Sequence, residues 1–324
     1  MTTLPEPRRI ALPGRWNDPH FHLSVYEAGA GPPVVLCHGF PDLAVGWRHQ
    51  ITALAEAGFR VIAPDMRGYG GSSAPSEVEA YGMAEISGDL VALLDALEIE
   101  RAVFVGHDWG GFITWAMPLL HPQRVAGVAG LCTPYMPFPG LDIHLALVEG
   151  EVERQYVAWF QQPGVAEAYM NPRTRPILSN IMRTHVPLEE VLALAMADGK
   201  LNMNPFLDVE NKASLGDPLM DAEDFEYYVE TFTRTGFGGG INWYRNIDAN
   251  LRNHPQVGVQ PLDLPCLMLT AADDPALRPE LAADMPERCS SLEMHNIENA
   301  GHWLQQERAD EVNRHLTAWL RRLS

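Results

Sequence analysis

The sequence predicts an α/β fold in which a mostly parallel sheet is flanked by helices and carries an inserted helical cap. Short apolar runs bounded by Gly, Pro or Asp alternate with longer stretches of helical periodicity, a pattern typical of parallel sheets. The alternation stops after residue 133 and resumes near residue 264, and the stretch between shows helical patterns without strands. We therefore expect a core of residues 1–133 and 247–324 and a cap of residues 134–246.

The expected elements of the core follow in order along the chain. Residues 21–26 alternate apolar and polar side chains, as an antiparallel strand at the edge of a sheet does. Residues 83–97 and 311–320 repeat their large aliphatic side chains at helical spacing, which predicts two helices packed on the sheet. The parallel strands are expected at the apolar runs 33–37, 60–64, 102–106, 125–132 and 266–270.

The expected cap is rich in aromatic side chains and is bounded by segments rich in Gly and Pro. Residues 134–140 and 236–240 look like its hinges, and we expect the cap to lie over one end of the sheet. Its aromatic residues are Tyr156, Trp159, Phe160, Tyr169, Phe225, Tyr227, Tyr228, Phe232, Trp243 and Tyr244.

Composition limits the classes of function. The chain of 324 residues is 46% hydrophobic, which is enough for a large buried core. Its formal net charge of −19 repels phosphate backbones and anionic lipid, so we expect neither a nucleic-acid nor a membrane partner. No apolar run approaches the roughly 20 residues that span a bilayer. The four cysteines are widely spaced without a CxxC motif, which favours a reduced, cytoplasmic protein.

The sharpest chemical signal is the segment GHDWGG at residues 106–111. It follows an expected strand and precedes an expected helix, which is the context of a nucleophile elbow with Asp108 in place of the usual serine. In such a turn the next backbone N–H, here on Trp109, is free to bind an oxyanion. For this motif alone, an ordinary Gly-rich turn is the alternative.

Three further segments supply the partners that such an elbow needs. The segment HGFP at residues 38–41 follows the first parallel strand, so the Phe40 N–H is expected as the second oxyanion donor. Asp274 follows a later strand, and His302 lies in a loop before the last helix. The chain order of nucleophile, acid and base is the order found in hydrolases with this elbow. Asp273 is the neighbouring alternative for the acid.

The chemistry of a carboxylate explains why Asp108 stands at the elbow. A carboxyl group with a pKa of about 4 is already ionised at neutral pH and needs no base before it attacks. Attack on an ester or amide would give a high-energy anhydride, whereas attack on a saturated carbon gives an ordinary ester. His302 can then activate water against that ester. The substrate is therefore expected to carry an electrophilic saturated carbon with a leaving group.

The chain resembles the soluble epoxide hydrolase family of the α/β-hydrolase fold from about residue 16 to residue 320. The matching segments are HGFP at 38–41, DMRGYGGS at 65–72, GHDWGG at 106–111, FQQPGVAE at 160–167, GINWYRN at 240–246 and GHW at 301–303. The resemblance implies that Asp108 is the nucleophile, His302 the base and Asp274 its partner. It also implies that Tyr244 holds the epoxide oxygen from the cap and that no cofactor is needed.

One position departs from the family pattern. The family has a second cap tyrosine just before the Phe-Gln-x-Pro-Gly segment, where Trp159 stands in this chain. An indole N–H donates a hydrogen bond but does not usefully give up its proton. We expect Tyr244 to be the acid alone, with Trp159 as a helper donor or Tyr156, one helical step earlier, as a substitute. Packing within the cap is the alternative for both Tyr156 and Trp159.

The expected activity is hydrolysis of an apolar epoxide, with or without an aryl group, to a vicinal diol, with the epoxide and water as partners and without cofactor or metal. Contacts with the substrate are expected from His38, Tyr156, Trp159 and Trp243. A haloalkane dehalogenase with the same triad is the first alternative, because the Trp109 indole could bind a halide. A non-catalytic ligand-binding protein of this fold is the second. A homodimer is compatible with each of these functions.

Overall fold

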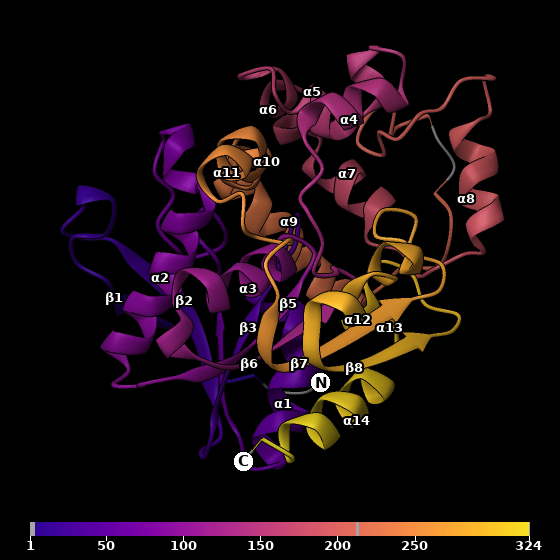
Figure 1. Ribbon diagram of the computed structural model, residues 1–324. Helices are drawn as coiled ribbons and strands as arrows, with labels where there is room; N and C mark the ends of the chain where they lie inside the picture. The colour runs from indigo at the N-terminus through magenta and orange to yellow at the C-terminus, as the bar shows by residue number, and fades with distance from the viewer. Residues whose placement is uncertain (1–3, 212–213, 324) are drawn as a thin grey trace.

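We describe the chain from a computed structural model, in which residues 4–211 and 214–323 are placed. One eight-stranded sheet runs through it in the order β1-β2-β4-β3-β5-β6-β7-β8, and a group of helices lies above it (Figure 1). β1 and β4 pair antiparallel with β2, and all pairs from β4 through β3 to β8 are parallel. The predicted fold class, an α/β fold with a mostly parallel sheet, is confirmed.

The strands are β1 (Arg8–Ala11), β2 (His22–Ala28), β3 (Pro33–Cys37), β4 (Arg60–Pro64), β5 (Ala102–His107), β6 (Val125–Leu131), β7 (Leu262–Ala271) and β8 (Cys289–Ile297). Every residue of β5 is buried, because helices cover both faces of the middle of the sheet. β1 was not predicted from the sequence. It is an edge strand with one buried residue out of four, so it lacks an alternating pattern.

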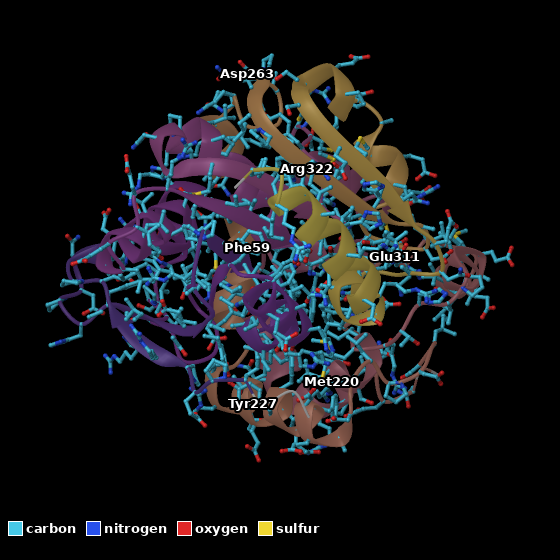
Figure 2. All side chains as sticks on the ribbon, turned by 90° about the horizontal axis from the view of Figure 1, so that it is seen from below. Phe59, Met220, Tyr227, Asp263, Glu311 and Arg322 are labelled. Carbon is cyan, nitrogen blue, oxygen red and sulfur yellow. The ribbon has the colours of Figure 1, made fainter. Side chains whose placement is uncertain are left out.

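The core helices divide between the two faces of the sheet. α2 (Met83–Ala96) and α3 (Trp109–Leu120) pack on one face, in the larger apolar cluster. α1 (Arg48–Glu56) and α14 (Ala309–Leu320) pack on the other face, where Figure 2 shows α14 crossing the molecule as a yellow helix. Two short helices, α12 (Met285–Arg288) and α13 (Leu304–Glu307), flank β8.

Between β6 and β7 the described chain forms helices and no sheet strand. They are α4 (Leu141–Leu147), α5 (Tyr156–Trp159), α6 (Val165–Met170), α7 (Thr174–Ile181), α8 (Leu188–Ala195), α9 (Ala222–Thr235), α10 (Gly238–Arg245) and α11 (Ile247–Asn253). Figure 1 shows them gathered above the sheet. α11 begins at residue 247, directly after the expected end of the cap, and the division into core and cap stays a prediction.

Polar contacts join the helices above the sheet to the core. The Tyr228 hydroxyl of α9 donates a hydrogen bond of 2.5 Å to Asp42, and Asp224 forms an ion pair of 2.8 Å with Arg48. All four cysteines are buried free thiols. In the described part of the chain, no helix combines the length and the apolar character needed to cross a membrane.

Candidate active site

Asp108 lies at the carboxyl end of β5, in the turn that leads into α3. Its backbone has φ 52° and ψ −124°, a conformation that residues with a side chain rarely adopt. Neighbouring glycines make the turn possible, because a Cβ on Gly106 would lie 2.3 Å from the Gly110 carbonyl oxygen. The Thr133 hydroxyl donates a hydrogen bond of 2.8 Å to the Asp108 carbonyl and holds the turn from the neighbouring strand. This geometry is that of the expected elbow.

The loop after β3 meets the Asp108 carboxylate directly. The Phe40 N–H donates a hydrogen bond of 2.7 Å to Oδ1 of Asp108. A Cβ on Gly39 would lie 2.2 Å from the same oxygen, so only glycine allows this approach. Burial raises the pKa of Asp108, whereas the charge of His302 and the N–H groups of Phe40 and Trp109 act in the opposite direction. Of the two expected oxyanion donors, the Phe40 N–H therefore bonds directly to the carboxyl group, and the Trp109 N–H acts on its pKa.

His302 lies in the loop between β8 and α13 and faces two carboxylates. Its Nδ1–H donates a hydrogen bond of 3.0 Å to Asp274, and its Nε2 lies 3.8 Å from Oδ2 of Asp108. Asp274 is fully buried, and its other oxygen accepts the N–H groups of Ala276 and Leu277. The imidazole is thus oriented with one nitrogen toward Asp274, the expected acid, and the other toward Asp108, the expected nucleophile.

Asp273, the alternative for the acid, lies elsewhere. One of its oxygens is 4.0 Å from Nε2 of His185, and His302 bonds to Asp274 instead.

The charges of Asp108, Asp274 and His302 shift one another's pKa values away from their ordinary values. Burial acts to raise the pKa of Asp274, but the charge and hydrogen bond of His302 lower it to about 2. Burial acts to lower the pKa of His302, but Asp274 and Asp108 raise it to about 9. Below the elbow, burial and the charge of His302 lower the pKa of His107 to about 3. At neutral pH His302 therefore carries a proton, and Asp274, to which its Nδ1–H is bonded, is ionised.

Two tyrosines face Asp108 from the helices above. Tyr244 of α10 and Tyr156 of α5 have ring centroids 5.6 Å apart, and the Tyr244 ring lies 5.0 Å from that of Trp109. Burial raises the pKa of both hydroxyls, and the charge of Asp108 acts in the same direction. Both groups therefore stay protonated and lie within electrostatic reach of the nucleophile.

Trp159 lies apart from these rings. Its centroid is 5.6 Å from that of Phe160 and 5.9 Å from that of Tyr169. Among the described residues, its ring makes no contact with Tyr244 or Trp109. This placement agrees with packing inside the cap and not with the expected role as a helper donor.

Two other residues expected to touch substrate point into the core. His38 is fully buried, where its Nδ1–H donates to the Gly39 carbonyl at 3.0 Å and its Nε2 accepts the Met66 N–H at 2.9 Å. The Trp243 indole donates to the Arg67 carbonyl at 3.2 Å. Both side chains use their polar atoms to hold loops of the core, so neither the His38 nitrogens nor the Trp243 indole N–H is free to bond a substrate.

Sequence reasoning missed part of the aromatic lining. The Phe40 ring contacts those of Phe160, Phe206 and Phe237, with centroid distances of 5.5, 5.7 and 6.4 Å. Phe206 comes from the loop between α8 and α9, which carries no motif or periodicity. Nothing in the sequence around Phe206 indicates that it reaches the site.

The structure places the candidate metal ligands outside the site. Within the described residues, one group of three potential ligands comes together, namely Glu293, His295 and His315, on β8 and α14. Asp18, His20 and His22 lie close together in the sequence and carry side chains of types that bind metals, but among the described residues they form no such group.

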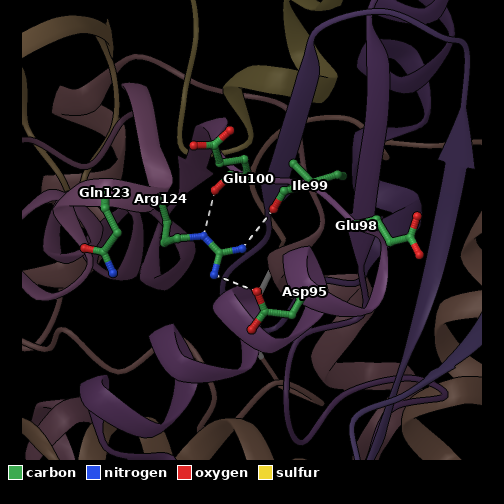
Figure 3. Close-up of a pocket in the computed structure, with 6 residues that line it drawn as sticks. All are labelled: Asp95, Glu98, Ile99, Glu100, Gln123 and Arg124. Carbon is green, nitrogen blue, oxygen red and sulfur yellow. Dashed lines mark hydrogen bonds and ion pairs between the residues drawn. The ribbon is translucent and has the colours of Figure 1, made fainter.

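A surface hollow lies at the opposite end of the sheet from Asp108. Its lining, drawn in Figure 3, consists of Asp95, Glu98, Ile99, Glu100, Gln123 and Arg124. These residues precede β5 and β6, whereas Asp108 follows β5. The Arg124 guanidinium bonds to Asp95 and to the carbonyls of Ile99 and Glu100, so it is already used by the fold. The hollow has no part in the chemistry at Asp108.

The chain is similar in sequence to enzymes from bacteria and mammals. Residues 32–309 match the family model described as alpha/beta hydrolase fold. The chain is 41% identical to epoxide hydrolase A of Mycobacterium tuberculosis over 306 residues, which cover 92% of this chain and 94% of that protein. It is 39% identical to bifunctional epoxide hydrolase 2 of Sus scrofa over 302 residues, which cover 93% of this chain and 54% of that protein. The chain thus spans about half the length of the mammalian relatives it matches.

Solved structures agree with these relatives. Epoxide hydrolase A from Mycobacterium thermoresistibile superposes with a TM-score of 0.84 at 39% identity, over 98% of both chains. An epoxide hydrolase from an endophytic Streptomyces superposes with a TM-score of 0.85 at 34% identity, over 97% of this chain and 94% of that one.

Proposed function

The chain belongs to the epoxide hydrolase family of the α/β-hydrolase fold, and from that membership we propose that it opens an apolar epoxide to a vicinal diol. The observation that carries the proposal is the pair of protonated tyrosines, Tyr156 and Tyr244, that face an elbow carboxylate. Opening an epoxide needs a nucleophile for the carbon and, at the same time, a donor for the oxygen. The ring oxygen leaves as an alkoxide and requires a proton or a strong hydrogen bond.

In the first step, the Asp108 carboxylate attacks one epoxide carbon. A C–O bond forms between Asp108 and that carbon, and the bond from the carbon to the ring oxygen breaks. The hydroxyls of Tyr156 and Tyr244 hold the ring oxygen, and one of them gives it a proton. The product is a hydroxyalkyl ester on Asp108.

In the second step, His302 removes a proton from water, which attacks the ester carbonyl of Asp108. Alkylation has by then removed the charge of Asp108, one of the carboxylates that raise the pKa of His302. The imidazole therefore loses its proton more readily once the ester has formed, and that proton returns to the tyrosine that protonated the ring oxygen. The N–H groups of Phe40 and Trp109 stabilise the tetrahedral oxyanion. When it collapses, the imidazolium protonates the departing alkoxide to give the diol, and the new Asp108 carboxyl group returns its proton to His302.

The lining of the site fits an apolar substrate. The rings of Phe40, Trp109 and Phe160 contact that of Tyr244, and Phe206 packs against Phe40. Such rings pack well against an aryl or alkyl group. A dehalogenase would need the Trp109 indole free for a halide, and here the Tyr244 ring lies edge-on to that indole with a centroid distance of 5.0 Å. A reducing compartment such as the cytoplasm belongs to the same proposal, because the four cysteines are buried free thiols.

The test is the intact mass of the His302→Gln variant after exposure to styrene oxide and, separately, to 1-bromohexane. Without the base, alkylation continues and the ester stays on Asp108. We expect a mass gain equal to one whole styrene oxide, which is absent from the double variant with Asp108→Ala. A gain equal to bromohexane minus hydrogen bromide, without a styrene oxide adduct, would contradict the proposal in favour of dehalogenation. No adduct from either compound, together with no diol from the wild type, would favour a binding protein.

A further inference from the structure

The loop that carries His302 is anchored by a carboxylate that the two chemical steps do not use. Glu307 lies at the end of α13, and its side chain is 3% exposed. One of its oxygens accepts the Trp303 N–H at 3.1 Å, and the other accepts the Gly301 N–H at 3.3 Å. These two N–H groups belong to the residues directly before and after His302. Glu307 therefore fixes the backbone on both sides of the base.

The same carboxylate reaches the segment between α7 and α8. Glu307 accepts the His185 N–H at 2.7 Å, and the His185 ring lies 3.5 Å away. A second bond runs beside it, because the Trp303 indole donates to the Ile181 carbonyl at 2.7 Å. The segment 181–185 is thus bonded at two points to the loop that holds the base.

The His302 main chain is held from below as well. Its carbonyl oxygen accepts the Nε2–H of His107 at 2.6 Å and the thiol of Cys132 at 3.4 Å. Main-chain groups of the loop are therefore bonded to three different parts of the fold, and the imidazole ring alone is left to face Asp108 and Asp274. A loop bonded in this way holds its side chain in one position, which a base acting on water requires.

We propose that Glu307 is a positioning residue for His302 in the hydrolysis of the Asp108 ester, and that it docks the segment 181–185 onto the loop that carries the base. The inference rests on the proposed function, because it assigns Glu307 to the second chemical step. Charge-assisted bonds from backbone N–H groups to a carboxylate are stronger than neutral ones. An amide at this position could accept from two of the three N–H groups and would turn its own NH₂ toward the third.

The charge of Glu307 also acts on the base. The carboxyl groups that act on His302 are Asp274, Asp108 and Glu307, and the charge of each raises its pKa, while burial lowers the pKa of His107 beneath it. Burial raises the pKa of Glu307 itself, whereas His185 and the N–H groups of Gly301 and Trp303 act in the opposite direction. Loss of the Glu307 charge should therefore lower the pKa of His302. Since the base acts in its neutral form, the rise of the hydrolysis rate with pH should move to lower pH.

The experiment compares Glu307→Gln with Glu307→Asp and with Glu311→Gln, a matched carboxyl-to-amide change on the outside of α14 (Figure 2). Rapid quenching after mixing with styrene oxide, followed by intact-mass measurement, gives the rate at which the ester forms and the rate at which it disappears. For Glu307→Gln we expect ester hydrolysis to slow by about tenfold to a hundredfold. Ester formation should stay within about twofold of wild type, because Asp108 and the tyrosines are untouched.

The three variants separate a positioning role from a structural one. Glu307→Asp keeps the charge and should restore the pH profile of ester hydrolysis with only part of its rate, and Glu311→Gln should match the wild type in both steps. The proposal is overturned if folded Glu307→Gln hydrolyses its ester at the wild-type rate with an unshifted profile. If Glu307→Gln fails to fold, Glu307→Asp decides, and equal losses in both steps would overturn the proposal. Failure of the proposed function differs from all of these, because the wild type itself would form neither ester nor diol.

Discussion

The lower and upper halves of the site are held in place by different interactions. In the lower half, Asp108 and His302 sit at the ends of β5 and β8, where backbone N–H and carbonyl groups fix their loops. In the upper half, Tyr156 and Tyr244 sit on short helices and are held by contacts between aromatic rings. Hydrogen bonds demand one geometry, whereas ring packing tolerates several. The lower half should therefore be intolerant of substitution, and the upper half should respond in a graded way.

The largest expected effect comes from the lower half. Asp108→Ala removes the group that forms the ester, so diol formation should fall by at least about 10⁴-fold. Steady-state assays with styrene oxide measure this loss, and circular dichroism checks that the variant is folded. Turnover within about a hundredfold of wild type would show that water attacks the epoxide directly and that the site does not work through Asp108.

Substitutions in the upper half should have smaller effects, shared between the two tyrosines. Tyr156→Phe and Tyr244→Phe each remove one donor to the epoxide oxygen, so each should slow ester formation by about tenfold to a hundredfold, and the double variant should lose more than either. Ester hydrolysis should change little. Single-turnover measurements separate the two steps.

Trp159→Phe is the matched control for the upper half. It changes a ring on the same helix as Tyr156, so it should leave ester formation within about twofold of wild type. If Trp159→Phe slowed ester formation as much as Tyr156→Phe, the assignment of the second tyrosine would be wrong.

The smallest expected effect is the pH dependence of stability, which concerns the lower half alone. The pKa of His302 is raised to about 9 in the folded chain, so its stabilising contribution is complete below the unfolded pKa of about 6.5 and is lost as the pH rises through 9. Between pH 6.5 and 9 the free energy of unfolding should fall by roughly 2 kcal/mol. Urea unfolding measures the change. The decline should be smaller in the His302→Gln variant, and an equal decline there would assign it to other groups.

The difference between the lower and upper halves of the site also determines which residues could be placed from the sequence. Asp108, Asp274 and His302 each follow a strand in a short motif, and strand ends in a parallel sheet meet at one edge, so their proximity can be inferred from the chain alone. The upper half depends on the rotation of α5, a helix of four residues. A difference of three positions in such a helix decides whether Tyr156 or Trp159 faces Tyr244, and no periodicity in so short a segment sets that phase.

The sequence also does not reveal in which direction a side chain within a motif points. His38 and Trp243 belong to recognisable segments, yet both turn their polar atoms toward carbonyl and N–H groups of the core. Glu307 is the opposite case, because it belongs to no recognisable motif and yet has a specific role. An acidic residue just before a helix is usually at the surface, whereas three N–H groups converge on Glu307 in the structure. Each of these roles includes one partner far away in the sequence, namely Met66 for His38, Arg67 for Trp243 and His185 for Glu307.

The order of these groups along the chain has a consequence for folding. Phe40 and Asp108 precede the inserted helices, whereas Asp274 and His302 come only with β7 and β8. A folding intermediate that had not yet added these last two strands would hold the nucleophile without its base. Such a species could react with an epoxide once and would then remain alkylated. Repeated turnover is therefore a direct signal that the last part of the sheet has assembled.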